Sequence, residues 1–275
     1  MVHSFPTRRS SDLPDTYEQS PTPVTMVLSA VMAKMGVFGL LRWLLPVLPT
    51  LSFQWGDNFA TLGVAGMLYA SFIAMQQDDL KRLVAYSSIA HIGLMVVAIF
   101  APSNGGIQGV MIQMFNHGVN ILGMWIVVNA IEQKLGTRKI SELGGLAQKA
   151  PALTILLVIV ALANIAMPLT NAFIGEFIMF NGVLGSTATK FGVIYAVGGG
   201  LTIILSAVYT LRMVQQVFYG PTNSVTEKAT DISMNVQVAL GVIVVAIVLV
   251  GIYPKPLLEL TSDVTNHIMS RIFIK

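Results

Sequence analysis

The amino-acid sequence predicts an all-α membrane protein, a bundle of about seven transmembrane helices of which one is discontinuous. Three observations support this fold class. Hydrophobic residues make up 54% of the 275-residue chain and charged residues only 11%, whereas a soluble domain carries about 25% charged residues. The apolar residues gather into runs of roughly the 20 residues that cross a bilayer as a helix. One run is about half again too long for a single span and is polar at its centre.

The predicted spans are separated by short polar connections. They are Pro23–Leu45, Phe59–Met75, Leu83–Ala101, Val110–Ile131, Pro151–Leu184, Val193–Met213 and Val236–Tyr253. The long run Pro151–Leu184 contains Asn164, Pro168 and Asn171. Proline removes a helical hydrogen bond, and a break at membrane depth is tolerated only where protein or water covers the backbone. We therefore predict one discontinuous helix, interrupted between about Ala163 and Asn171.

Lysine and arginine are divided unevenly between the connections, and this division predicts the orientation. The connections Gln76–Arg82, Glu132–Lys149 and Arg212–Asp231 carry Lys81, Arg82, Lys134, Arg138, Lys139, Lys149, Arg212 and Lys228. The opposite loops carry Lys190 and Lys255, with Arg42 just inside a helix end and Arg271 and Lys275 in the tail. Because short basic loops stay in the cytoplasm, we expect the three connections and the region near Pro14 to be cytoplasmic.

The first residues, "MVHSFPTRRSSDL", do not fit this pattern. A signal peptide needs an apolar stretch of about 7–15 residues after its basic start, and this segment has none. The string "FPTRRSSDL" is also the translation of a widely used short-read sequencing adapter. We therefore expect residues 1–13 to be a non-native, adapter-derived segment, and residues 14–275 to be the carboxyl-terminal part of a longer membrane domain. An ordinary disordered amino terminus is the other interpretation.

Two charged residues, Lys34 and Glu176, lie deep within predicted spans. A charge at the bilayer centre costs about 2.5–3.5 kcal/mol on insertion scales, so its presence indicates a function. A structural ion pair or a snorkelling side chain is the other interpretation, but roughly ten apolar residues flank Lys34 on each side, too many for snorkelling. The residues around Lys34 include the small set Ser29, Ala30, Ala33, Gly36 and Gly39. Small residues allow close helix contact, so this span should pack in the bundle interior.

Neighbouring spans carry uncharged polar residues at matching depth. Ser87 and Ser88 share a helical face with His91. The string "QMFNHGVN" sets Gln113, Asn116, His117 and Asn120 at positions i, i+3, i+4 and i+7, a single polar stripe that can hold a file of waters. Histidine titrates near neutrality and lysine can be brought there by burial. Lys34, His117 and Glu176 are therefore the predicted proton-exchanging residues.

The composition also excludes several classes of function. The chain has no cysteine, which excludes disulfides, iron–sulfur clusters and zinc–thiolate sites. No basic run is interleaved with aromatic residues in the manner of nucleic-acid grooves. His91 and His117 could serve as axial ligands of a haem, but their polar surroundings do not resemble a macrocycle pocket. We expect no cofactor, no bound metal and no nucleic-acid partner.

Four strings carry a resemblance to a known family: "LPDTYEQSPTPVTMVLSAVMAKMGVFGLLRW", "QQDDLKRLVAYSSIAHIGLM", "QMFNHGVN" and "MPLTNAFIGEF". From Leu13 to about Pro256 the chain resembles the M subunits of bacterial NADH:quinone oxidoreductase, the counterparts of mitochondrial subunit 4. That family has fourteen spans in two inverted repeats. The resemblance implies that the seven spans here are its eighth to fourteenth helices, in a multi-pass protein of the bacterial inner membrane.

The resemblance also implies roles for individual residues. Lys34 matches the central lysine of the eighth helix, His117 the histidine of the eleventh, and Glu176 the acid after the break in the twelfth, where a proton is thought to leave. His91 and Lys81 are secondary candidates. The implied function is proton translocation within a respiratory complex whose other subunits oxidise NADH and reduce quinone. The implied partners are the other membrane subunits and the lipid bilayer.

The sequence departs from this family in two ways. The family often writes its helix break "PGTGNFVGEF", whereas Leu169 and Asn171 stand here in place of glycines. The amino-terminal half of the family's pattern, with its glutamate and lysine, is missing. An alternative function is a subunit of a multisubunit cation/proton antiporter or of a membrane-bound hydrogenase. Those antiporter subunits usually carry lysine where Glu176 stands, which favours the M subunit. A purely structural remnant is a third possibility.

Overall fold

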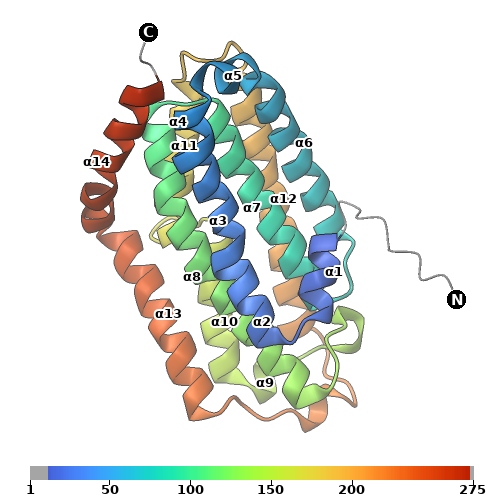
Figure 1. Ribbon diagram of the computed structural model, residues 1–275. Coiled ribbons are helices and arrows are strands. Elements are labelled where there is room, and N and C mark those ends of the chain that lie inside the picture. Colours follow the sequence, from blue (N-terminus) through green and yellow to red (C-terminus); the bar gives the residue numbers. More distant parts are fainter. Residues whose placement is uncertain (1–11, 273–275) are drawn as a thin grey trace, which may run out of the picture.

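The computed structural model describes residues 12–272, and nearly all of them lie in helices (Figure 1). The segment 1–13 that we expect to be adapter-derived lies outside the described residues, apart from Asp12 and Leu13. The α-helices are α1 (Asp12–Gln19), α2 (Thr22–Val27), α3 (Ala33–Gly39), α4 (Leu45–Val47), α5 (Pro49–Gln54), α6 (Gly56–Met75), α7 (Leu80–Phe100), α8 (Asn104–Leu135), α9 (Leu146–Lys149), α10 (Pro151–Asn164), α11 (Asn171–Leu184), α12 (Gly192–Phe218), α13 (Met234–Ile252) and α14 (Lys255–Ile272). Two π-helical turns, η1 (Leu28–Met32) and η2 (Leu40–Leu44), join α2, α3 and α4 into one rod, and two 3₁₀ turns, η3 (Ile140–Glu142) and η4 (Thr226–Lys228), lie in the connections.

Six helical segments of the described chain are long and apolar enough to cross a membrane. They are Thr22–Val47, Gly56–Met75, Leu80–Phe100, Asn104–Leu135, Gly192–Phe218 and Met234–Ile252. Each contains or closely overlaps a span predicted from the sequence. The predicted all-α bundle is thus confirmed, and α8 is longer than expected because residues 104–109 and 132–135 continue the helix at its two ends.

The seventh span is formed by the two shorter apolar helices α10 and α11. The first ends at Asn164 and the second begins at Asn171. This confirms the predicted discontinuous helix and its position. In the break, Ala166 (φ 54°) and Leu169 (φ 72°) adopt left-handed backbone conformations. These two residues and Pro168 interrupt the helix, and Thr170 then leads into α11.

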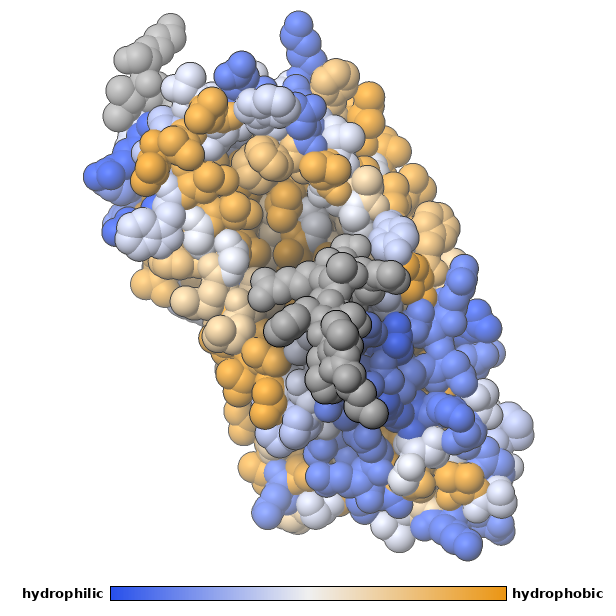
Figure 2. All heavy atoms as spheres, turned by 45° about the vertical axis from the view of Figure 1, so that its right-hand side comes forward, coloured by the Kyte–Doolittle hydropathy of each residue, from blue (hydrophilic) through white to orange (hydrophobic). Residues whose placement is uncertain are grey.

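The three lysine- and arginine-rich connections gather at one end of the bundle, which we call the basic end. Main-chain hydrogen bonds join two of them, from Leu80 to the carbonyl of Arg138 and from Ile140 to the carbonyl of Asp78. The third connection is joined by Lys134, whose ammonium donates to Thr230. Figure 2 shows hydrophilic side chains concentrated at this lower end and apolar side chains over the middle of the same face.

Very close backbone contact holds α11 against α8 and so sets the geometry of the centre. A Cβ added to Gly182 would lie 2.2 Å from the backbone nitrogen of Gly106. Only glycine at this position allows such an approach, in the manner of small-residue contacts between membrane helices. The contact brings the polar stripe of α8 against the start of α11.

The rod that carries Lys34 lies at the edge of the bundle, so the prediction of an interior span is wrong for part of its surface. Ser29, Lys34 and Val37 are buried, whereas an added Cβ on Gly36 or Gly39 would meet nothing within 4 Å. The reason is that the rod packs chiefly against α8 along one face. The rod approaches α8 closely at a different point, where the carbonyl of Ala30 lies against Gly118.

Among the helices that were not predicted, the longest follows α13. After α13, the chain continues as α14, which packs against α8 and α4 near the end opposite the basic end (Figure 1). Gln108 of α8 donates to the carbonyl of Leu258 in this helix. The mixed composition of α14 hides it from a search for apolar runs, because only one face is apolar.

Candidate functional site

The centre of the bundle holds a carboxylate with two nitrogen partners from neighbouring helices. Glu176 on α11 is only 2% exposed. Its Oε1 lies 3.0 Å from Nδ1 of His91 on α7 and accepts a hydrogen bond of 3.1 Å from the amide of Gln113 on α8. A buried carboxylate is stable when such groups satisfy it. Its second oxygen has no hydrogen-bond partner among the described residues.

A second histidine stands beside this pair. The ring centroids of His91 and His117 are 5.2 Å apart, and the rings are tilted by 50°. His117 is 2% exposed, and neither of its ring nitrogens has a hydrogen-bond partner in the described chain. Lys34 lies within electrostatic range of the same ring. We call Lys34, His91, His117 and Glu176 the buried ionisable cluster.

Lys34 is held by its own helical rod. Its Nζ donates to the carbonyl of Ser29 over 2.7 Å. That carbonyl belongs to the π-helical turn η1, which ends directly before α3. A π-turn displaces carbonyls from the regular helical ladder and is frequent at functional sites. The ammonium is buried, with 6% exposure, so the site holds a group that can carry a proton at the face of α8.

The polar stripe of α8 faces the break between α10 and α11, and its residues share one helical face, as predicted. Asn116 donates to the carbonyl of Asn171, and Asn171 donates back to the carbonyl of Asn116. One turn further along, Asn120 donates to the carbonyl of Ala163. Asn120 therefore satisfies a carbonyl in the last turn of α10 that the break frees, which is the condition for irregular backbone at membrane depth.

Several side-chain atoms around the cluster are buried without a hydrogen-bond partner among residues 12–272. They include Oδ1 of Asn116, Asn120 and Asn164, Nε2 of His91 and Oγ of Ser88. Buried polar atoms of native proteins are nearly always satisfied by protein or by ordered water. Their concentration around the buried ionisable cluster thus favours bound water between the helices.

The comparisons with known proteins agree with this geometry. Residues 11–202 match the family described as NADH:quinone oxidoreductase/Mrp antiporter, transmembrane region. The chain belongs to this family.

Individual relatives give a more specific comparison. It is 34% identical to the NADH-quinone oxidoreductase subunit M of Rickettsia typhi over 90% of this chain and 49% of the relative. It is 32% identical to subunit M of Escherichia coli, over 93% of this chain and 50% of the relative. The chain thus spans about half the length of the curated relatives it matches.

Solved structures give the same fold. A chain of respiratory complex I from Thermus thermophilus with bound NADH is similar with a TM-score of 0.83 and 26% identity, over 93% of this chain and 54% of that one. The Mrp complex from Dietzia is similar with a TM-score of 0.83 at 16% identity, over 94% of this chain and 57% of that one. The likeness to the Mrp complex supports the fold alone.

Within this antiporter-family fold, the structure brings together His91, His117 and Glu176, with Lys34 at the side of His117. It places Lys81 apart, at the first turn of α7. Ten residues separate Lys81 from His91 along the helix, which is about 15 Å. Its Nζ instead pairs with Glu132 over 2.9 Å, and its side chain is 5% exposed.

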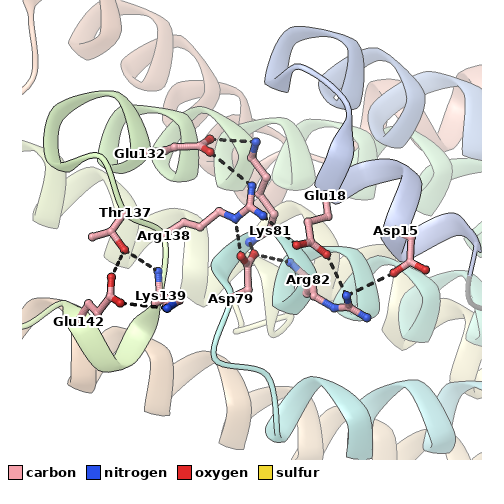
Figure 3. Close-up of polar contacts among 10 residues, drawn as sticks. All are labelled: Asp15, Glu18, Asp79, Lys81, Arg82, Glu132, Thr137, Arg138, Lys139 and Glu142. Atoms are coloured by element: carbon pink, nitrogen blue, oxygen red, sulfur yellow. Dashed lines mark hydrogen bonds and ion pairs between the residues drawn. The ribbon is translucent and has the colours of Figure 1, made fainter.

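Lys81 belongs to an ion-pair cluster at the basic end (Figure 3). Glu18 of α1 pairs with Arg82 over 2.9 Å and with Arg138 over 2.8 Å. Arg138 also contacts Asp79 and, at 3.4 Å, Glu132. Partial burial opposes the charged form of Arg138, but the hydrogen bond and charge of Asp79, with the charges of Glu132 and Glu18, raise its pKa. The guanidinium stays ionised and ties α1, α7, α8 and the following connection together.

Sequence reasoning missed Tyr209 and Ser206 of α12. Tyr209 is 1% exposed and donates to Oγ of Ser87, which also accepts from Asn164. A tyrosine within an apolar run needs a hydrogen-bond partner when it is buried. That requirement is the signal that could have drawn attention to it.

The helix break allows a first prediction. Leu169 has a φ of 72° at a position where the family often has glycine, and its side chain is 71% exposed. A left-handed conformation costs an L-residue about 1–2 kcal/mol, and glycine loses part of this gain to chain entropy. Leu169→Gly should therefore raise the free energy of unfolding by about 1 kcal/mol, measured by thermal unfolding in detergent.

The matched control is Leu201→Gly, at an exposed position within α12. Glycine in an ordinary helix costs about 1 kcal/mol, so this variant should unfold at a lower temperature. An equal loss of stability in both variants would show that the backbone at Leu169 is not strained.

Proposed function

We propose that this chain is a proton-translocating part of the membrane arm of a respiratory NADH:quinone oxidoreductase in the bacterial inner membrane. The observation that carries the proposal is the buried ionisable cluster, in which His91 lies between Glu176 and His117 at the centre of the bundle. Charges at this depth are costly and are kept where they move ions or protons. Relatives named as subunit M of that enzyme support the assignment.

The geometry suggests how a proton would move. A proton on Glu176 passes to Nδ1 of His91 across 3.0 Å, and His91 then releases a proton from Nε2. The neighbouring ring of His117 stands 5.2 Å away, centroid to centroid, and is the next group that can take up the proton. Lys34 is the remaining member of the cluster and would exchange the proton with His117 in the last step. Each acceptor loses one proton as it gains one, so no net charge accumulates.

The chain supplies no electron transfer of its own in this proposal. It has no cysteine, so it offers no thiolates for an iron–sulfur cluster. Oxidation of NADH and reduction of quinone would occur in other subunits of the complex. This chain would act as one subunit of the translocating enzyme, with the other membrane subunits and the bilayer as its partners.

A cation/proton antiporter subunit is the second candidate, and the likeness of fold to the Mrp complex favours keeping it. A membrane-bound hydrogenase subunit of the same superfamily belongs to the same alternative. Glu176 argues against the antiporter, since its subunits usually carry lysine at the matching position. Proton uptake that requires sodium and proceeds without NADH would support the antiporter instead.

Lys34 provides the direct test. In vesicles that contain the purified complex assembled with this chain, Lys34→Ala should leave NADH oxidation measurable while NADH-driven proton uptake falls by about tenfold or more. Lys34→Arg should restore little of it, because arginine keeps its proton at physiological pH.

The control is Lys255→Ala, which removes an exposed lysine that pairs only with Glu259 among the described residues, at the surface. It should pump normally. Normal proton uptake by Lys34→Ala in a fully assembled complex would mean that Lys34 is only structural and would contradict the proposed function.

A further inference from the structure

A cavity of about 290 Å³ lies between the end of the rod that carries Lys34 and the last turns of α14. Its volume is near the lower limit for small-ligand sites, which is about 300 Å³. The ends of α4 and α14 both lie at the end of the bundle opposite the basic end (Figure 1). The residues that line the cavity are Arg42, Trp43, Pro46, Val47, His267, Ile268 and Arg271.

The charged and polar side chains of this cavity are all hydrogen-bond donors. A guanidinium has five N–H donors and no acceptor, and an imidazole has at least one donor. No carboxylate is among the described residues that line the cavity, and Asp263 lies about two turns before Arg271 on α14. Neither Arg42 nor Arg271 forms an ion pair or a side-chain hydrogen bond among residues 12–272. An anion is therefore the ligand that complements this cavity.

The depth of the cavity indicates the kind of anion. Lys34 stands at the middle of the candidate span Thr22–Val47, and Arg42 lies eight residues further along the rod, about 12 Å from it. Half of the hydrocarbon core of a bilayer is about 15 Å thick. The Arg42 side chain can thus extend to the level of the lipid phosphates. Trp43 is 66% exposed, and tryptophan is enriched at this level in membrane proteins.

Exposed apolar side chains beside the cavity favour a lipid over a free anion. Val47 lines the cavity and is 67% exposed, and Trp43 is exposed next to Arg42. On the other wall, Val264 is 44% exposed one turn before Ile268. Inorganic phosphate would contact only the donors, whereas a phospholipid would also place acyl chains against these apolar side chains.

We propose that this cavity binds the phosphodiester headgroup of an anionic phospholipid from the leaflet opposite the basic end. Arg42 and Arg271 donate to the phosphate oxygens, which match the fork of a guanidinium, and His267 donates a ring N–H. The acyl chains lie along Trp43 and Val47. The lipid then bridges the rod and α14, two elements that also contact each other directly through α4. The proposal rests on this cavity and is independent of the proposed function.

Quenching of tryptophan fluorescence by brominated lipids tests the site. The chain has three tryptophans, of which Trp43 lines the cavity, Trp125 is fully buried and Trp55 is exposed. In the full chain with Trp55→Phe, reconstituted into phosphatidylcholine vesicles, quenching therefore reports lipid in contact with Trp43. Phosphatidylglycerol with brominated acyl chains should bind there with about tenfold preference over brominated phosphatidylcholine, because two arginines attract its charge.

Substitution of the two arginines tests their role. Arg42→Gln and Arg271→Gln should each lower the preference for phosphatidylglycerol, and together they should bring it close to about one. Lys190→Gln is the matched control, because Lys190 is an exposed cation at the same end that does not line the cavity. This variant should keep the full preference. Thermal unfolding of each variant checks that the fold is retained.

Stability in detergent gives an independent measurement. A ligand that binds only the native state raises the unfolding temperature, so phosphatidylglycerol should stabilise the unmodified chain more than phosphatidylcholine does, and the double arginine variant should lose this difference. Inorganic phosphate, at equal ionic strength, should have a much smaller effect. Equal stabilisation by inorganic phosphate and phosphatidylglycerol would assign the cavity to a free anion and overturn the lipid site.

Two results of the quenching experiment would also overturn the proposal. Equal quenching by the two brominated lipids would leave the arginines to an acidic segment of a partner protein. A preference that survives the double substitution, or that Lys190→Gln lowers as much, would come from the general charge of this end of the bundle. None of these measurements needs turnover, so the lipid site can fail while the Lys34 result stands, and the reverse is also true.

Discussion

Replacing Glu176 by glutamine should strongly reduce proton uptake by the assembled complex while leaving the fold intact. Glutamine keeps the shape of glutamate, and its carbonyl can still accept from the amide of Gln113, which now lies 3.1 Å from Oε1, beside Nδ1 of His91 at 3.0 Å. It cannot bind or release a proton. Positioned proton transfer contributes about 10²–10⁴-fold to a rate, so NADH-driven proton uptake should fall by about a hundredfold, measured in vesicles alongside quinone reduction.

Glu259→Gln is the control for this change. Glu259 is exposed and forms only a surface pair with Lys255 in the described chain, so the same chemical change there should alter neither uptake nor stability. Thermal unfolding of both variants checks that the fold is retained. If Glu176→Gln pumps at the normal rate, Glu176 is a structural acid and proton transfer uses other groups.

Removing Arg138 should cause the largest loss of stability outside the centre. Its guanidinium contacts Glu18, Asp79 and Glu132 and joins two connections to α1 (Figure 3). Arg138→Gln leaves three carboxylates near one another without their shared cation. Breaking a buried pair costs about 3–5 kcal/mol, and the partial exposure of this cluster reduces the expected loss to about 2 kcal/mol. Thermal unfolding in detergent measures it.

Lys139→Gln is the matched control, because Lys139 is the next residue and pairs with Glu142 at 3.1 Å in an exposed position. Exposed pairs contribute less than about 1 kcal/mol, so this variant should unfold close to the unmodified protein. High salt should weaken the Lys139 pair more than the Arg138 cluster. Equal and small effects of both substitutions would mean that the cluster does not hold the connections together.

Hydropathy alone was sufficient to predict the spans, since it adds up the transfer free energy of consecutive residues. The break was predictable for a related reason. Asn164, Pro168 and Asn171 cannot continue an apolar helix at low cost, and α10 and α11 end and begin at two of them. The amphipathic helix α14 was not predictable in this way. Neither was the outward position of Gly36, because small residues allow close packing without requiring it.

The sequence by itself determined that this is a helical membrane protein, where its long helix is interrupted, and which polar residues are buried at its centre. Only the tertiary structure decided which of them meet. Glu176 contacts His91, which lies 85 residues away, and not Lys34, and Lys81 lies with Glu132 at the basic end. The physical reason is that transfer free energy is a property of each segment, whereas contacts between segments depend on helix rotation and axial offset. Backbone packing such as that of Gly106 against Gly182 sets both, and no local pattern in the chain encodes it.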